Sequence, residues 1–239
     1  MDLLNKTFTV HGMSVVVEPQ PPTILSQRLR DFLVGDTVRG VEIPGDDTPG
    51  DAGTLASVDW QVEHDDPGTT HRVELVYERS TFIAYLLLSR GMLLTYAPAP
   101  IRNAIIQFLS RTFDTRISVL IPNSATLIRI FETWLEDGVR TTKKDVVITL
   151  GFSDKAVSGG LRSLDVTIPA DDLAGFVGID DGARFSDKLA AYMHRHLALD
   201  IQHSEVRVGK ISCGGFMLGE GKLKVLDEAT AAVVLGGIK

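Results

Sequence analysis

The sequence predicts an α+β fold with mainly antiparallel sheets, helices packed on them, and two lobes. Segments with alternating apolar residues group with one another, and helical segments lie between the groups, which argues against a regular series of parallel units. Turn residues separate the strand-like segments at short intervals. The composition, 44% hydrophobic and 23% charged over 239 residues, is that of a globular chain. We expect an N-terminal α+β lobe over residues 1–138 and a C-terminal β-rich lobe over 139–239.

The N-terminal lobe is expected to begin with a strand or a bent hairpin around Gly12 over 6–17, which ends at a proline cluster. A helix follows, because apolar residues from Leu25 to Leu33 recur at helical spacing, and Gly35 is its expected stop. The next segment, 37–43, predicts a strand. Residues 44–53 combine Pro, Gly and Asp and predict an exposed acidic loop, whose role the sequence leaves open.

The middle of the chain predicts an antiparallel meander followed by two helices. Strands are expected over 54–63, 71–78 and 81–88. Pro98 or Pro100 opens the first helix, a short strand covers 116–121, and Asn123 or Ser124 caps the second helix, which ends at Gly138. This end is the expected lobe boundary.

The C-terminal lobe returns to strand periodicity. Its predicted elements are strands over 146–150 and 162–168, a helix over 186–197, strands over 205–212, 216–218 and 222–226, and a last helix over 227–235 that Gly236 and Gly237 end.

The charge and cysteine content limit the class of protein. The net charge is −7, and residues 1–70 alone carry 12 acidic and 4 basic side chains, so any DNA contact has to be local. A single cysteine, Cys213, excludes an internal disulfide and favours a reducing compartment, cytosolic or nuclear. The start resembles no signal peptide and the longest apolar run, 82–88, is too short to span a bilayer, so we expect an unexported protein with no membrane contact.

No catalytic, metal or cofactor motif emerges. The glycine-rich segment 214–222 has Phe216 where a phosphate loop needs glycine, and it predicts a hairpin. His194 and His196 diverge on a helix, so they are poor ligands for one metal ion. Cys213 has no histidine neighbour in sequence and is expected to be a small buried hydrophobe. We therefore expect no cofactor and no metal, and the residues indicate no enzyme class.

Basic residues near the C-terminus are the positive feature of the sequence. They are Arg207, Lys210, Lys222 and Lys224. Because Lys222 and Lys224 alternate with Leu223 and Val225, both lysines lie on one side of a strand. This arrangement either protects an exposed sheet edge or binds phosphate.

Three stretches resemble the CENP-L family of inner-kinetochore proteins in its fungal form. They are residues 26–41 (SQRLRDFLVGDTVRGV), residues 111–118 (RTFDTRIS), and the pair formed by 213–216 (CGGF) and 221–225 (GKLKV). The order of segments agrees over nearly the whole chain, including the meander around 73–88. None of these stretches is a catalytic signature, so the resemblance is one of fold and turns.

The resemblance implies a non-enzymatic structural subunit of the constitutive centromere-associated network in the nucleus. Such a subunit forms a heterodimer with a CENP-N-type partner, and the pair binds centromeric CENP-A chromatin alongside other inner-kinetochore subunits and supports chromosome segregation. The partner is expected to make most of the contacts that recognise the nucleosome. Family pairing uses the C-terminal β-rich region, here residues 205–226, and members can form homodimers in isolation.

Two sets of residues follow as candidates. The first set is expected to divide between the core and the partner surface: Val206, Val208, Phe216, Leu218, Leu223 and Val225. The second set, expected to add a weak, salt-sensitive DNA contact in the assembled pair, is Arg207, Lys210, Lys222 and Lys224.

Two alternatives stay open from the sequence. One is a cytosolic enzyme whose active site is assembled from residues distant in sequence. The other is a cytosolic assembly protein with no link to nucleic acid. A deep apolar pocket with converging titratable residues would favour the enzyme, and an exposed sheet edge or apolar patch would favour an interaction module.

Overall fold

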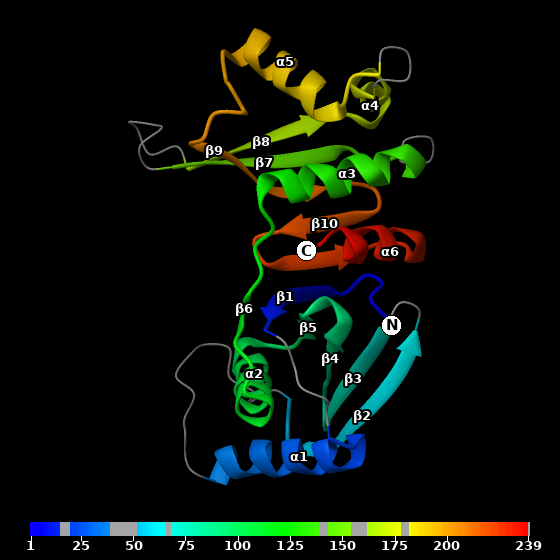
Figure 1. The fold of residues 1–239 in the computed structure, drawn as a ribbon, viewed down its shortest axis with the longest axis vertical. Coiled ribbons are helices and arrows are strands. Elements are labelled where there is room, and N and C mark those ends of the chain that lie inside the picture. The colour runs from blue at the N-terminus through cyan, green and yellow to red at the C-terminus, as the bar shows by residue number, and fades with distance from the viewer. Residues whose placement is uncertain are drawn as a thin grey trace. The chain divides into compact units, whose positions relative to one another are not determined.

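The computed structural model has helices packed on antiparallel strands, and the predicted α+β class is confirmed (Figure 1). It describes residues 1–14, 20–38, 52–65, 68–138, 143–153, 162–177 and 182–238. The chain forms two compact units: unit 1 is Met1 with Phe8–Leu120, and unit 2 is Asp2–Thr7 with Ile121–Lys239. No helix in the described ranges is long and apolar enough to cross a membrane.

Unit 1 is an antiparallel meander with two long helices. Its elements are β1 (Thr7–Met13), α1 (Pro22–Val38), β2 (Leu55–Asp65), β3 (Gly68–Tyr77), β4 (Thr81–Leu87), η2 (Leu88–Arg90), β5 (Met92–Tyr96), α2 (Ala99–Phe113) and β6 (Ile117–Val119). The strand order is β2-β3-β4-β5-β1, and β6 pairs with β1. All of these pairings are antiparallel.

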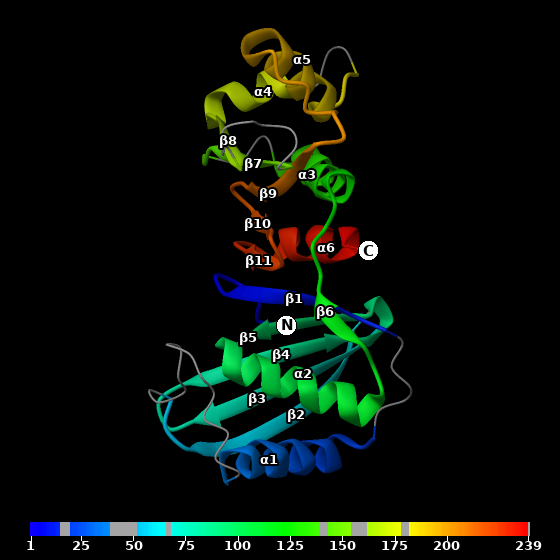
Figure 2. The same cartoon turned by 90° about the vertical axis from the view of Figure 1, so that its left-hand side faces the viewer.

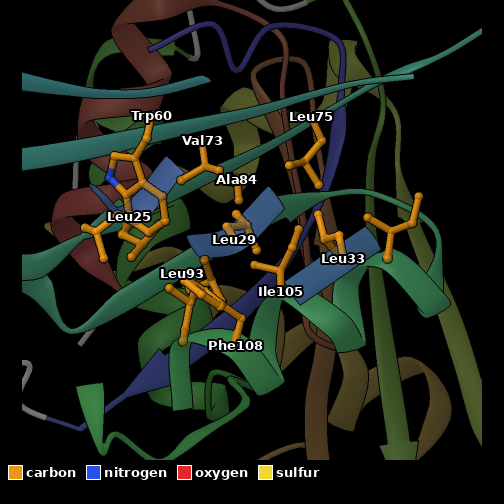
Figure 3. Packing of buried hydrophobic residues seen from close by; sticks show 13 residues of the cluster. Leu25, Leu29, Leu33, Trp60, Val73, Leu75, Ala84, Leu93, Ile105 and Phe108 are labelled. Carbon is orange, nitrogen blue, oxygen red and sulfur yellow. The ribbon is translucent and has the colours of Figure 1, made fainter. Parts of the chain in front are cut away.

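The core of unit 1 lies between the meander and the two helices (Figure 3). Leu25 and Leu29 of α1, like Ile105 of α2, are almost completely buried against strand residues. Aromatic contacts extend this packing, since the Phe108 ring centroid lies 5.7 Å from that of Phe32 and 6.5 Å from that of Trp60. The helical spacing of these residues therefore places them on one face, as their sequence predicts.

Helix α1 also covers the outer strand of the meander. Ser26 Oγ donates a hydrogen bond of 2.6 Å to the Val58 carbonyl oxygen of β2. An edge strand carries backbone groups that no neighbouring strand satisfies, and covering them prevents unwanted strand pairing. The β2 edge of unit 1 is therefore closed within the chain.

Unit 2 contains the C-terminal sheet and most of the shorter helices. Its elements are α3 (Ser124–Gly138), β7 (Val146–Phe152), β8 (Ser163–Ile168), η3 (Ala170–Asp172), α4 (Leu173–Phe176), α5 (Phe185–Leu197), β9 (Val206–Ser212), β10 (Phe216–Gly219), β11 (Lys222–Val225) and α6 (Glu228–Gly237). The strand order is β11-β10-β9-β7-β8. Leu4 of the N-terminal segment adds a parallel bridge to Val225.

Helices α3 and α6 pack on one face of β9, β10 and β11 (Figure 2). Trp134 of α3 contacts Phe216 of β10 with ring centroids 6.1 Å apart, and its Nε1 donates to Thr230 Oγ1 of α6 at 3.2 Å. Asp227 caps α6, because its Oδ1 accepts from the Thr230 amide at 2.8 Å. One tryptophan thus joins a strand and two helices of this core.

The end of α1 differs from the prediction. Gly35 was expected to stop the helix, but α1 continues to Val38, so the predicted strand over 37–43 is wrong at Thr37 and Val38. Glycine inside a helix costs only about 1 kcal/mol, and the buried residues of the preceding turns offset that cost. The rest of that strand, 39–43, and residues 44–51 of the acidic loop lie outside the described residues.

Two other elements, β5 and α6, differ from the sequence prediction. Strand β5 was not predicted, because its short apolar run shows neither helical nor strand periodicity. Its pairing with β4 and β1 defines it as a strand. The last helix includes both Gly236 and Gly237. A Cβ on Gly237 would lie 2.3 Å from Ile130 Cγ1, so this glycine permits close packing of α6 on α3.

The boundary between the units falls before α3, whereas the sequence placed a lobe boundary after it. Phe131 and Trp134 of α3 are buried in the core of unit 2, since Phe131 contacts Phe185 at 4.8 Å and Trp134 contacts Phe216. The division into an N-terminal α+β lobe over 1–138 and a C-terminal β-rich lobe over 139–239 stays a prediction.

Candidate functional site

The candidate site is the sheet of unit 2, and its geometry starts from the β10–β11 hairpin. Gly219 pairs with Lys222, and the two loop residues Glu220 and Gly221 have φ values of 53° and 72°. Positive φ at both central positions is the requirement of a type I′ turn, which matches the twist of a two-stranded hairpin. The turn fixes the register that places Phe216 opposite Val225 and Leu218 opposite Leu223.

This register sends the predicted partner residues into the core of the same chain. Five of the six are buried: Val208 at 7% exposure, Phe216 and Leu218 at 0%, and Leu223 and Val225 at 1%. Val206, opposite Phe152 at the start of β9, is partly exposed. The expected division between core and partner surface therefore leaves Val206 alone as a side chain that a partner could contact.

The opposite face of the same strands carries the predicted basic residues. Gly219 of β10 is flanked by Lys210 of β9 on one side and Lys222 of β11 on the other. One row further along, Met217 is opposite Lys224. Because residues that face each other across antiparallel strands point to the same side, these three lysines lie on one face.

A β-bulge brings Arg207 onto that face. Leu150 pairs with Val208 and Thr149 pairs with Lys210, so Gly209 is an extra residue in β9. In a regular strand positions 207 and 210 would point to opposite faces, and the inserted residue brings them to the same one. We call the set Arg207, Lys210, Lys222 and Lys224 the basic face.

The neighbours of the basic face include a glycine, polar side chains and the apolar Met217. Arg207 lies over Gly151, since a Cβ on that glycine would lie 3.1 Å from Arg207 Nε. The carboxylate of Asp165 shares the face, and its Oδ1 accepts a 2.6 Å hydrogen bond from Thr149 Oγ1. Within the described residues, no salt bridge engages any cation of the basic face. Glu205 shares the face as well, because it lies opposite Ser153, and its carboxylate accepts a hydrogen bond from Ser153 Oγ. Four cations and these two carboxylates therefore give a locally positive surface on an acidic chain.

The structure also places the remaining candidates of the sequence, Cys213, His194 and His196. Cys213 is buried, and burial raises the pKa of its thiol to about 11, so the unreactive thiol form dominates at neutral pH. His194 and His196 lie on α5, where the His196 ring contacts Tyr192 at 4.5 Å. No group of His, Cys, Asp and Glu that could hold a metal ion occurs in the part of the chain that the structure describes.

Sequence reasoning grouped the four cations but did not find what places them together. Alternation explains Lys222 and Lys224, which share a face in the structure as expected. Arg207 and Lys210 share it only because of the bulge, and the available signal was Gly209, a glycine inside an otherwise regular strand pattern. Thr149 and Asp165 are far away in sequence and gave no signal.

A comparison with curated proteins found no match. A scan against protein-family models did give one: the model for centromere protein L, CENP-L, matches residues 2–234. The match spans both units, from the N-terminal segment that bridges to β11 as far as α6. The chain therefore belongs to the CENP-L family of centromere proteins.

Proposed function

We propose that this protein is a non-enzymatic structural subunit of the inner kinetochore, within the constitutive centromere-associated network. It forms a heterodimer with a CENP-N-type partner and, with other inner-kinetochore subunits, helps to bind centromeric CENP-A chromatin during chromosome segregation. The observation that carries the proposal is the CENP-L match over residues 2–234, which includes nearly every described element.

The direct test is the molar mass of the assembly. We expect light scattering after size exclusion to give a one-to-one complex when the full chain is co-expressed with a CENP-N-type subunit, and a homodimer for the chain alone. A chain that stays monomeric in both preparations would contradict the heterodimer.

The pairing region is proposed to lie within residues 205–226. Because five of its six candidate side chains are already buried, partner contact falls to Val206 and to surface groups around it. We expect Val206→Asp to weaken the complex without unfolding the chain. Val34→Asp is the matched control, since Val34 is 46% exposed on α1 of unit 1. Equal complex mass and affinity for the wild type and Val206→Asp would show that pairing uses another surface.

The basic face is proposed to contact the DNA backbone in the assembled pair. Its cations lie on a sheet face where Arg207 and Lys222 are exposed and Lys210 and Lys224 are half-buried, so a phosphate backbone can approach them. Phosphate contacts need charge but no base sequence. The contact is expected to be weak and salt-sensitive because only four cations are available against a net charge of −7.

Charge reversal tests this contact. In the assembled pair, glutamate at Arg207, Lys210, Lys222 and Lys224 should lower DNA affinity and reduce the salt slope by roughly 0.9 for each phosphate that is no longer neutralised. The matched control reverses four exposed cations elsewhere, Arg28, Arg30, Lys143 and Arg195, and has the same net charge. Equal reductions in both variants would assign the effect to overall charge and remove the site.

A further inference from the structure

The bulge in β9 leaves one buried backbone amide without an acceptor in the sheet. The Ser153 amide donates to the Glu205 carbonyl at 3.1 Å. Because hydrogen-bonded positions recur at every second residue of an antiparallel pair, the backbone of residues 205 and 207 faces β7, and that of Val208 faces away from it. On that side, β10 pairs with β9 only as far as Gly219, which is opposite Lys210. The strands of the described sheet therefore provide no acceptor for the Val208 amide.

Ser124, the first residue of α3, provides this acceptor. Helix α3 packs beside β9 (Figure 2), and the Val208 amide donates a 2.9 Å hydrogen bond to Ser124 Oγ. The first turn of α3 is capped by another residue, since Asn123 Oδ1 accepts from the Thr126 amide at 2.8 Å. The two adjacent polar residues thus have different partners, because Asn123 bonds to the helix and Ser124 bonds to the strand.

The hydrogen bond to Ser124 lies next to the residues whose direction the bulge decides. Val208 lies between Arg207 and the extra residue Gly209, and it is 7% exposed. A buried amide that loses its acceptor is unfavourable, and little water can reach Val208 to replace the hydroxyl. Without Ser124 Oγ, the bulge would therefore rearrange, and Arg207 would no longer be held on the face that carries Lys210.

Arg207 depends on this backbone for its place on the outer face of the sheet. It lies opposite Gly151 of β7, where a Cβ would lie 3.1 Å from Arg207 Nε and 3.3 Å from Arg207 Cγ. The glycine makes room for the arginine but does not hold it in place. Among the described residues no salt bridge engages Arg207, so its position is set by the backbone of β9.

We propose that Ser124 is a positioning residue of the basic face. It holds the bulge through the Val208 amide and so keeps Arg207 beside Lys210, where both cations can contact one phosphate backbone. The inference rests on the DNA contact proposed above. It adds to that contact a residue that lies on a helix and acts through Arg207.

Amide hydrogen exchange of the full chain tests the hydrogen bond without DNA. Ser124→Ala should make the Val208 amide exchange roughly tenfold faster than in the wild type. Ser124→Thr keeps a hydroxyl acceptor and should restore slow exchange. The matched control is Ser186→Ala, which removes a hydrogen bond of 2.8 Å to Glu132 Oε1 on another part of α3 and should leave Val208 unchanged.

Two results of the exchange experiment would overturn the proposal. One is unchanged exchange of the Val208 amide in Ser124→Ala. The other is exchange of the Val208 amide in the wild type at the rate of an unfolded chain, which decides the matter even if Ser124→Ala does not fold.

Binding of duplex DNA by the assembled pair tests the consequence. Ser124→Ala should lower the affinity by the same factor as Arg207→Gln, at most about tenfold at 0.1 M salt, and should reduce the salt slope by roughly 0.9, the value for one phosphate contact. Ser124→Thr and Ser186→Ala should bind like the wild type. The double variant Ser124→Ala with Arg207→Gln should bind no more weakly than Arg207→Gln alone, because Ser124 acts through Arg207. An additive loss in the double variant would overturn the proposal.

The outcomes separate this inference from the DNA contact on which it rests. If charge reversal of the whole basic face leaves DNA binding of the assembled pair unchanged, the proposed DNA contact fails. If Arg207→Gln weakens DNA binding and Ser124→Ala does not, the contact stands and the positioning role of Ser124 is wrong.

Discussion

Strands of the two units bury their faces differently. In unit 1, β4 is buried on both faces: Leu86 and Leu87 point to opposite sides and are 1% and 3% exposed. In unit 2, the faces of β10 and β11 differ: Phe216 and Leu223 are buried, while Met217 and Lys224 are only partly so. A strand that is buried on both faces has no side chains in contact with solvent. A strand that packs on the core with only one face can carry charged side chains on the other.

This difference accounts for where the candidate site lies. A cation in β4 would be desolvated and unpaired, which costs several kcal/mol. Cations on the outer side of β9 and β11 stay hydrated and cost little. A basic face is therefore compatible with β9 and β11 of unit 2 and incompatible with β4 of unit 1.

The largest expected effect is in β10. Phe216→Ala should lower the free energy of unfolding by about 3–5 kcal/mol, because it leaves a cavity beneath Trp134. Met217→Ala, on the other face of the same strand, is the matched control and should cost less than about 1 kcal/mol. Urea unfolding followed by circular dichroism measures both. Similar destabilisation at the two positions would show that both faces of β10 are core.

Adjacent positions in β4 should not show this alternation. Leu86→Ala and Leu87→Ala are each expected to cost about 2–5 kcal/mol, since both side chains are buried. The same urea experiment measures them. A small destabilisation by Leu87→Ala would mean that β4, like β10, has a free face, and the contrast between the units would fail.

Acid sensitivity should come from unit 1. His71 is buried, and Trp60 Nε1 donates a hydrogen bond of 3.0 Å to its Nδ1. Because of this burial, the pKa of His71 is lower than its ordinary value of 6.5. The unfolded chain then binds a proton that the folded chain does not, so stability should fall as the pH drops below about 6.5, by at most about 1.4 kcal/mol per pH unit for one histidine. Burial lowers the pKa of His11 in the same direction.

Two histidine variants test whether His71 and His11 cause this pH dependence of stability. His71→Gln keeps an acceptor for Trp60 and should flatten the dependence of unfolding free energy on pH between 7.5 and 5.5, and His71→Gln with His11→Gln should flatten it further. The measurement is urea unfolding at each pH. A slope that survives in the double variant would place the acid-sensitive groups elsewhere.

The smallest expected effect concerns the closed edge of unit 1. Ser26→Ala removes the hydrogen bond to the Val58 carbonyl and should cost about 0.5–1.5 kcal/mol. Ser204→Ala is the control, because Ser204 is exposed. Thermal unfolding of both variants measures the difference. Unchanged stability of Ser26→Ala would indicate that water satisfies this carbonyl and that α1 does not close the edge.

Much of the secondary structure could be predicted because its signals are local. Periodicity located α2, α3 and α5, and the alternation in 222–225 placed two lysines on one face. The features that the sequence did not predict share a cause. Strand β5, the continuation of α1 past Gly35 and the packing role of Gly237 depend on neighbours distant in sequence, which local propensity does not report.

The candidate residues show the same limit. Their apolar or basic character was evident, but alternation alone could not say that five of the six apolar candidates would fill the core of their own chain. The sequence by itself determined the α+β class, the alternating strands and the resemblance to the CENP-L family. Tertiary structure decided which strand face is buried, how the bulge at Gly209 brings Arg207 beside the lysines, and which strand helix α1 covers, because each depends on the register between strands and on the helices that pack on them.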